Sequence, residues 1–139
     1  MKRMVIDTGP LVALLNSRDA HHVWARDVLD RIDPPLVTCE AVLSEACFLV
    51  RNLEGGPAAV LEFVARGIVE IPFRVEPEIA AIRRLMARYA SVPMSLADAC
   101  LVRMTELDER ATILTLDRDF AIYRRNGRRL VPHVSPPRS

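Results

Sequence analysis

The chain has 139 residues, of which 50% are hydrophobic and 27% are charged. These values fit one globular domain over residues 1–139 and exclude a disordered chain. The 19 basic and 18 acidic residues give a formal net charge of +1, so net charge alone identifies no partner. Lys2 is the only lysine, which excludes chemistry that needs an internal lysine, such as a Schiff base.

The cysteines and the hydropathy pattern indicate where the protein works. Cys39, Cys47 and Cys100 are odd in number and lack CxxC spacing, so we expect reduced thiols packed as small hydrophobic side chains. No apolar run reaches the roughly 18 residues of a membrane span, and the N-terminus has no signal-peptide pattern. These features predict a cytoplasmic protein without a membrane partner.

Strand and helix signals alternate along the chain. Pro10 suits a first helical turn, Asp19 and Ser95 can cap helices, and Gly67 suits the position just after one. In chain order we predict a strand at Arg3–Asp7, helices at Thr8–Ser17 and Asp19–Ile32, a strand at Leu36–Thr38, helices at Glu40–Leu53 and Pro57–Arg66, a strand at Ile68–Ile71, helices at Glu78–Tyr89 and Ser95–Glu109, and strands at Thr112–Thr115 and Leu130–His133. Short apolar strands that alternate with helices predict a three-layer α/β/α domain with a mainly parallel central sheet.

Four carboxylates are predicted to meet at one edge of this sheet. Asp7 ends the first strand, Asp117 follows the fourth, Asp98 lies in the first turn of the helix before that strand, and Glu45 lies in the helix after the second strand. Ligands bind beyond the carboxyl ends of parallel strands, where the following helices also start. Crowded carboxylates repel one another and therefore require a cation or a proton.

The expected ligand set contains only oxygen atoms, because His21, His22 and His133 are expected elsewhere. An all-oxygen site suits Mg²⁺ or Mn²⁺ rather than Zn²⁺. Its natural substrate is a phosphate ester, whose own oxygens complete the metal shell.

Each acidic residue also has a plainer structural interpretation. Asp7 could cap the first helix, the Ser95-x-x-Asp98 spacing matches a capping box, and Asp117 and Asp119 could form a turn. Four coincidences would then have to select the same edge, which favours a shared site. The chain has no GxxxxGK[ST] or GxGxxG motif, which argues against a nucleotide-binding loop and a dinucleotide-binding fold. It also lacks a GxSxG motif and an internal lysine, which argues against a serine hydrolase and a lysine-dependent phosphotransferase.

The motifs also resemble a known family, the PIN domain, which is the fold of VapC-type toxin ribonucleases. The resemblance is carried in order by Val5–Leu15 (VIDTGPLVALL), Val42–Glu45 (VLSE), Met94–Ala99 (MSLADA) and Ile113–Phe120 (ILTLDRDF). It implies a metal-dependent endoribonuclease with Mg²⁺ or Mn²⁺ as cofactor. The catalytic and metal-binding positions that it implies are Asp7, Glu45, Asp98 and Asp117, with Thr8, Ser95 and Asp119 in support.

The resemblance further implies the toxin of a type II toxin–antitoxin pair, with an RNA substrate, an antitoxin partner and a homodimer. In the predicted mechanism one or two ions, held by Asp7, Asp98 and Asp117 with Glu45 direct or through water, activate a water on an RNA phosphodiester, and one carboxylate accepts its proton. Three alternatives remain: a non-catalytic RNA- or protein-binding module, a PIN nuclease of RNA processing without an antitoxin, and a nuclease specific for DNA flaps.

Two further segments allow two interpretations each. Arg124, Arg125, Arg128 and Arg129 flank an Asn126-Gly127 turn shortly after Asp117, and they form either a solvated loop or a rim that guides RNA by contacting its phosphates. The apolar face of the second helix, including Trp24 and Leu29, forms either ordinary core or an interface for dimerisation and antitoxin binding.

Overall fold

A five-stranded parallel sheet is the centre of the molecule in a computed structural model that describes residues 2–137. The strand order is β3-β2-β1-β4-β7, and all four pairings are parallel. The strands are β1 (Arg3–Ile6), β2 (Leu36–Val37), β3 (Val69–Glu70), β4 (Ala111–Leu114) and β7 (His133–Val134). The predicted domain 1–139 also includes Met1, Arg138 and Ser139, which lie outside the described residues.

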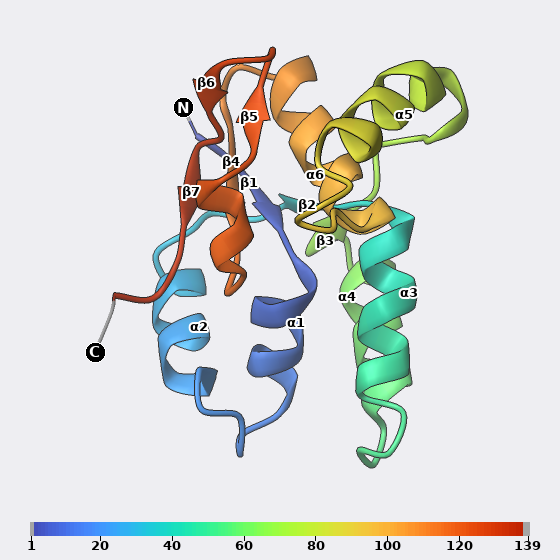
Figure 1. The fold of residues 1–139 in the computed structure, drawn as a ribbon. Helices are drawn as coiled ribbons and strands as arrows, with labels where there is room; N and C mark the ends of the chain where they lie inside the picture. Colours follow the sequence, from blue (N-terminus) through green and yellow to red (C-terminus); the bar gives the residue numbers. More distant parts are fainter. Residues whose placement is uncertain (1, 138–139) are drawn as a thin grey trace.

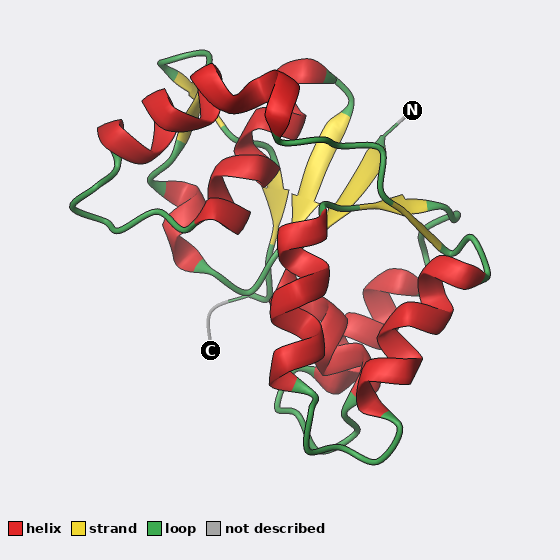
Figure 2. Cartoon of the chain, turned by 90° about the vertical axis from the view of Figure 1, so that its right-hand side faces the viewer, coloured by secondary structure: helices red, strands yellow, loops and turns green. Residues whose placement is uncertain are grey.

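The central strands are continuous apolar runs because both of their faces are covered. Val5 and Ile6 of β1 and Ile113 and Leu114 of β4 are fully buried, and Val5 aligns with Ile113 on one side and Val37 on the other. Figure 2 shows helices on both sides of the strands. The predicted three-layer α/β/α architecture is therefore confirmed.

Within residues 2–137, six helices and two 3₁₀ turns surround the sheet, and Figure 1 shows their arrangement. They are α1 (Thr8–Leu15), α2 (His22–Leu29), α3 (Glu40–Leu49), α4 (Gly56–Ala65), η1 (Glu76–Glu78), α5 (Ile79–Arg88), α6 (Leu96–Leu107) and η2 (Arg118–Ala121). Helix α1 packs against α2 and α3, α3 against α4, and α5 against α6. Within residues 2–137, no helix is long and apolar enough to cross a lipid bilayer. Cys39 and Cys100 are buried, Cys47 is half-buried, and all three thiols are free.

Several predicted helices end earlier than expected, and the second also begins later. The Asp19 carboxylate does not cap α2 but accepts a hydrogen bond from the backbone N–H of His21 at 2.8 Å, within the preceding turn. Helix α3 ends at Leu49 rather than Leu53, because the chain turns with a bond from the Leu53 N–H to the carbonyl of Val50 at 3.0 Å. Helix α4 ends at Ala65, one residue before the predicted Arg66, and Gly67 lies just beyond the Arg66 cap at a φ of +73°, as predicted.

The single strand predicted at Leu130–His133 is wrong, because the segment divides into β6 (Arg129–Leu130) and β7. Proline at position 132 has no N–H to donate, so it interrupts the ladder. Its carbonyl still accepts from the N–H of Ile113 at 2.9 Å, which guides β7 onto the edge of β4.

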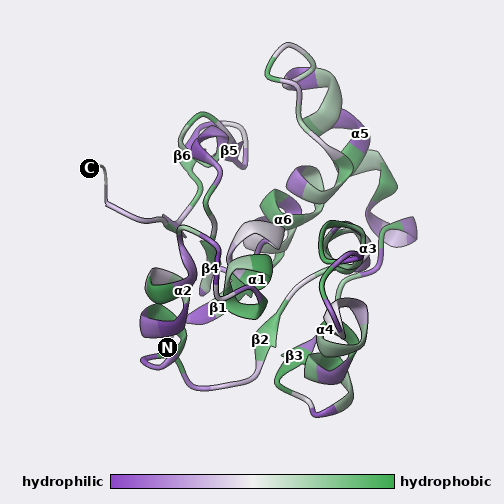
Figure 3. Ribbon diagram, turned by 90° about the horizontal axis from the view of Figure 1, so that it is seen from below, coloured by the Kyte–Doolittle hydropathy of each residue, from purple (hydrophilic) through white to green (hydrophobic). Residues whose placement is uncertain are grey.

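Strands β5 (Arg124–Arg125) and β6 form a separate antiparallel hairpin beside α6. Asn126 and Gly127 make its turn with φ angles of 51° and 85°, in the left-handed region that favours asparagine and glycine. Figure 3 shows β5 as hydrophilic, in contrast to the hydrophobic β2 of the central sheet.

Candidate active site

The four predicted carboxylates line one cavity of about 450 Å³, which we call the acidic cavity: Asp7, Glu45, Asp98 and Asp117. The predicted supporting residues Thr8, Ser95 and Asp119 line it as well. The cavity lies beyond the carboxyl ends of β1 and β4, where the chain order of the strands reverses. This switch point is where parallel α/β sheets bind ligands.

Asp7 joins β1 to α1 and is almost entirely buried, with 7% of its surface exposed. One carboxylate oxygen, Oδ1, accepts from the N–H of Thr8 at 2.8 Å, and Oδ2 accepts from the Thr115 hydroxyl at 2.7 Å. Burial raises the pKa of Asp7 to about 6, although both hydrogen bonds act to lower it. The negative charges of Asp98 and Asp117 add to the rise.

Thr115 links the carboxylate of Asp7 to the backbone of Asp117, and this role was not found from the sequence. Its hydroxyl donates to Asp7 and accepts from the backbone N–H of Asp117 at 2.9 Å, and the residue is fully buried. It therefore fixes the end of β4 against the end of β1. The motif ILTLDRDF contains this threonine, but the role of its hydroxyl depends on a partner 108 residues away.

Asp98 is positioned by a cap and by a tyrosine. Its N–H donates to the Ser95 hydroxyl oxygen at 3.0 Å, so Ser95 caps α6 as predicted. Its Oδ2 accepts from the hydroxyl of Tyr123 at 2.8 Å. Tyr123 is fully buried and packs edge-on against Phe120 and Tyr89. Burial raises the pKa of Asp98, while the bond from Tyr123 acts to lower it and the charge of Asp117 to raise it.

The other two carboxylates reach the acidic cavity from a turn and from a helix. Asp117 caps η2, since its Oδ1 accepts from the N–H of Asp119 at 2.8 Å. Glu45 is an exposed residue of α3. It is thus the member of the set with the greatest access to solvent.

The lining of the acidic cavity fits a hydrated divalent cation. Across residues 2–137, no three His, Cys, Asp or Glu side chains lie close enough together to hold a metal ion directly. None of the described residues that line the cavity is basic, so the carboxylates repel one another. Their oxygens are the donors that Mg²⁺ and Mn²⁺ prefer, and Mg²⁺ usually keeps several waters. The Thr8 hydroxyl lines the same cavity, buried and without a hydrogen-bond partner among the described residues. A water of a hydrated ion would satisfy it.

Two histidines lie closer to this site than expected. His21 and His133 line a second cavity of about 420 Å³, which we call the histidine cavity and which shares Leu116 and Asp117 with the acidic cavity. Neither histidine lines the acidic cavity itself, as expected, but the loop before α2 and the end of β7 bring both to the same edge of the sheet. Leu116 is packed against Gly9, where a Cβ would come within 3.0 Å of its side chain.

His22 behaves as expected and lines neither of these cavities. Its Nδ1 lies 2.8 Å from the carbonyl of Ala13. A carbonyl oxygen can only accept a hydrogen bond, so this nitrogen donates. His22 therefore joins α2 to α1.

The predicted arginine rim includes one residue that cannot take part in it. Arg125 is only 4% exposed, and it donates to the carbonyl of Thr105 at 3.2 Å and to Glu109 at 3.1 Å. Period-two alternation on β5 turns this side chain towards α6. The guanidinium of Arg124 donates to the carbonyls of residues 121, 122 and 123, whereas Arg128 and Arg129 are exposed.

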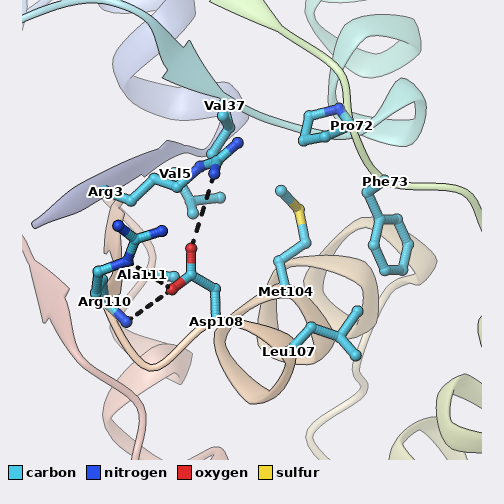
Figure 4. Close-up of a pocket in the computed structure, with 10 residues that line it drawn as sticks. All are labelled: Arg3, Val5, Val37, Pro72, Phe73, Met104, Leu107, Asp108, Arg110 and Ala111. Carbon is cyan, nitrogen blue, oxygen red and sulfur yellow. Dashed lines mark hydrogen bonds and ion pairs between the residues drawn. The ribbon is translucent and has the colours of Figure 1, made fainter.

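At the opposite edge of the sheet, the carboxylate of Asp108 lies among basic groups instead of other carboxylates (Figure 4). Asp108 lines a cavity of about 410 Å³ together with Arg3 and Arg110. The backbone N–H of Arg110, at 2.9 Å, together with the guanidinium groups of Arg110 and Arg3 lowers the pKa of Asp108. Paired in this way, Asp108 holds the turn between α6 and β4 against β1.

Comparison with known proteins agrees with this architecture. Residues 4–126 match the PIN domain family, so the chain belongs to that family, as its motifs predicted. Ribonuclease VapC26 of Mycobacterium tuberculosis (strain ATCC 25618 / H37Rv) is 32% identical over 117 residues, which are 83% of this chain and 87% of that protein. The crystal structure of VapC20 from the same species, a sarcin-ricin loop cleaving toxin, has a TM-score of 0.77 and 20% identity, with 86% of this chain and 93% of that chain covered. This second likeness supports the fold.

Proposed function

We propose that this chain is a metal-dependent endoribonuclease that hydrolyses RNA phosphodiester bonds. The observation that carries the proposal is the acidic cavity, where Asp7, Glu45, Asp98 and Asp117 converge and none of the described lining residues is basic. Family membership and the likeness to ribonuclease VapC26 support this reading. An all-oxygen site beside a sheet switch point favours phosphate chemistry assisted by Mg²⁺ or Mn²⁺.

The carboxylates and their hydrogen-bond partners would have different roles in holding the ion. Asp7, Asp98 and Asp117 would hold the hydrated ion, in part through its waters, and Glu45 would bind it directly or through water. When bound, the ion would act as a Lewis acid that lowers the pKa of water and neutralises charge on the phosphate. Hydrogen bonds from Thr115 to Asp7 and from Tyr123 to Asp98 fix the orientation of these ligands.

Proton transfer is best assigned to Glu45. Asp7, Asp98 and Asp117 each accept at least one hydrogen bond from the protein. Glu45 is exposed on α3, so it can take a proton from the attacking water without breaking such a bond. The buried Thr8 hydroxyl would orient water in the same cavity.

We further propose that the protein is the toxin of a type II toxin–antitoxin pair, with an antitoxin partner and a homodimeric assembly. The likeness to VapC26 supports this role. So do large apolar side chains that remain exposed on three helices: Val23 on α2, Phe48 and Leu49 on α3, and Leu61 on α4. Trp24 and Leu29 instead pack partly buried against the core, which favours the core interpretation for them.

Cleavage of single-stranded RNA in Mn²⁺ tests the nuclease assignment. Asp7→Asn and Asp98→Asn remove one negative charge each and keep the side-chain shape. We expect each to lower cleavage by about 100-fold or more, because even the outer partners of metal ligands are worth 10–100-fold. Asp27→Asn, at an exposed residue of α2, is the matched control and should cleave like the wild type. Near-normal RNA cleavage by Asp7→Asn would overturn the assignment. A DNA flap substrate assayed in parallel tests the alternative that the enzyme is specific for DNA flaps.

A further inference from the structure

The histidine cavity adjoins the acidic cavity but has a different chemistry. Three basic or aromatic side chains reach it from separate segments: His21 precedes α2, Arg118 begins η2 and His133 lies on β7. Ala121, Pro136 and Pro137 complete much of its lining. Its volume of about 420 Å³ is in the range of small-ligand sites.

These side chains suit a nucleotide. Arg118 is exposed, and a guanidinium can hold a phosphate through two parallel hydrogen bonds. The Nδ1 of His133 lies 2.8 Å from the carbonyl of Val131, so it must donate there, which fixes the ring. The remaining nitrogen, Nε2, is not used by this bond. Imidazole rings and arginine planes are surfaces on which unpaired RNA bases stack.

We propose that the histidine cavity is a subsite for the nucleotide next to the phosphodiester that is cleaved in the acidic cavity. The base would stack on His133 and His21, and its phosphate would bind Arg118. The inference rests on the proposed ribonuclease function and extends it to substrate positioning. Asp117 and Leu116 belong to both cavities, so a strand that enters one cavity adjoins the other.

The subsite would also supply the positive charge that RNA needs in order to approach the acidic cavity. A polyanionic strand is repelled by carboxylates and needs basic contacts nearby. Within the four-arginine segment predicted for this role, Arg125 is buried against α6 and Arg124 is bonded to backbone carbonyls. Arg118 directly follows Asp117 and is exposed, so it is placed to provide such a contact.

Binding measured without cleavage tests the subsite. The probe is a fluorescein-labelled single-stranded RNA octamer of mixed sequence, followed by anisotropy in EDTA. We expect His133→Ala to weaken binding about 5-fold or more, since one stacked base is worth roughly 1–3 kcal/mol. His133→Phe keeps a ring face and should bind within about threefold of the wild type. Arg118→Ala should reduce the log–log salt slope by about 0.7, the value for one phosphate contact on a single strand.

Two matched controls are available. His22→Ala changes a histidine beside His21, and Arg74→Ala changes an exposed arginine, and neither residue lines the two cavities. Both should bind RNA like the wild type. Melting temperatures establish whether each variant is folded. If His133→Ala unfolds, Arg118→Ala still tests the subsite, because Arg118 is exposed and its loss should not unfold the protein.

Wild-type affinity and salt slope in both His133→Ala and Arg118→Ala would overturn the subsite, as would a wild-type protein that does not bind the octamer. Equal losses of RNA affinity in His133→Phe and His133→Ala would also overturn the subsite, because base stacking would then contribute nothing to binding. Cleavage is not read in EDTA, so a failed nuclease assay leaves these results unaffected and the two proposals fail separately.

Discussion

Asp7 is the residue at which the demands of folding and of the site conflict most directly. It follows the buried strand β1, accepts two hydrogen bonds and is 7% exposed, yet the charges of two other carboxylates act on it. Its pKa, raised by burial to about 6, exceeds the value of about 3.9 expected in an unfolded chain. The folded protein therefore keeps this proton to higher pH than the unfolded chain does. The stability that protonated Asp7 contributes is fully present below about pH 4 and is lost as the pH rises through 6.

The first prediction concerns this loss of stability. In EDTA, the free energy of unfolding should fall between pH 4 and pH 7, with about 3 kcal/mol from Asp7 at 1.36 kcal/mol for each pKa unit. Burial raises the pKa of Asp98 as well, so that residue contributes in the same direction. Asp7→Asn should flatten the dependence and be more stable than the wild type at pH 7. Urea denaturation over this pH range measures the effect, with Asp27→Asn as the unchanged control. An Asp7→Asn variant no more stable than the wild type at pH 7 would contradict the account.

At the scale of elements, the β5–β6 hairpin separates arginines that look alike in the sequence. Arg125 points to α6 and is buried, whereas Arg128 lies at the exposed tip. A run of arginines gives no sign of this division until the strand positions are known, because alternation along a strand decides which side chains face inward. The turn itself could be predicted, since Asn126 and Gly127 suit left-handed backbone.

The second prediction distinguishes the two arginines by stability. Arg125→Ala removes the donor to the Thr105 carbonyl and the partner of Glu109, and it leaves a cavity against α6. It should lower the free energy of unfolding by about 2 kcal/mol, as expected for a buried carbonyl left without a partner. Arg128→Ala should change it by less than about 0.5 kcal/mol, which is usual for an exposed site. Equal stabilities in urea denaturation would show that Arg125 is not a structural clamp.

The ends of the elements were harder to predict than their order. Strand β1 and helix α1 are marked by a clear apolar run and by Pro10, and α6 is marked by its Ser95 cap. Helix α2 begins after a turn that uses the carboxylate of Asp19, and a side chain that suits a cap also suits such a turn. Local sequence does not decide between these two uses, because packing of the following residues selects one.

At the scale of the whole molecule, topology explains which parts of the site could be predicted. Parallel strands bring their carboxyl ends to one edge, so Asp7 and Asp117 could be placed together from the sequence alone. The partners of the carboxylates, Thr115 and Tyr123, could not be assigned to the site in this way. Their roles depend on the orientation of side chains that meet across distant elements, such as the bond from Tyr123 to Asp98. No sequence spacing encodes that orientation.

The last prediction concerns the response of the whole molecule to metal. Among residues 2–137, only acidic and uncharged side chains line the acidic cavity, so a divalent cation that binds only the folded state should stabilise the entire domain. At 100 times its dissociation constant, Mn²⁺ should add about 2.7 kcal/mol, or roughly 8 °C in melting temperature for a domain of this size. The shift should be larger at pH 7.5 than at pH 5, because Asp7 must lose its proton to bind the ion. Asp7→Asn should remove most of it at both pH values. A non-catalytic binding module would show little shift at either pH, so differential scanning calorimetry with Mn²⁺ and with EDTA separates that alternative from the nuclease.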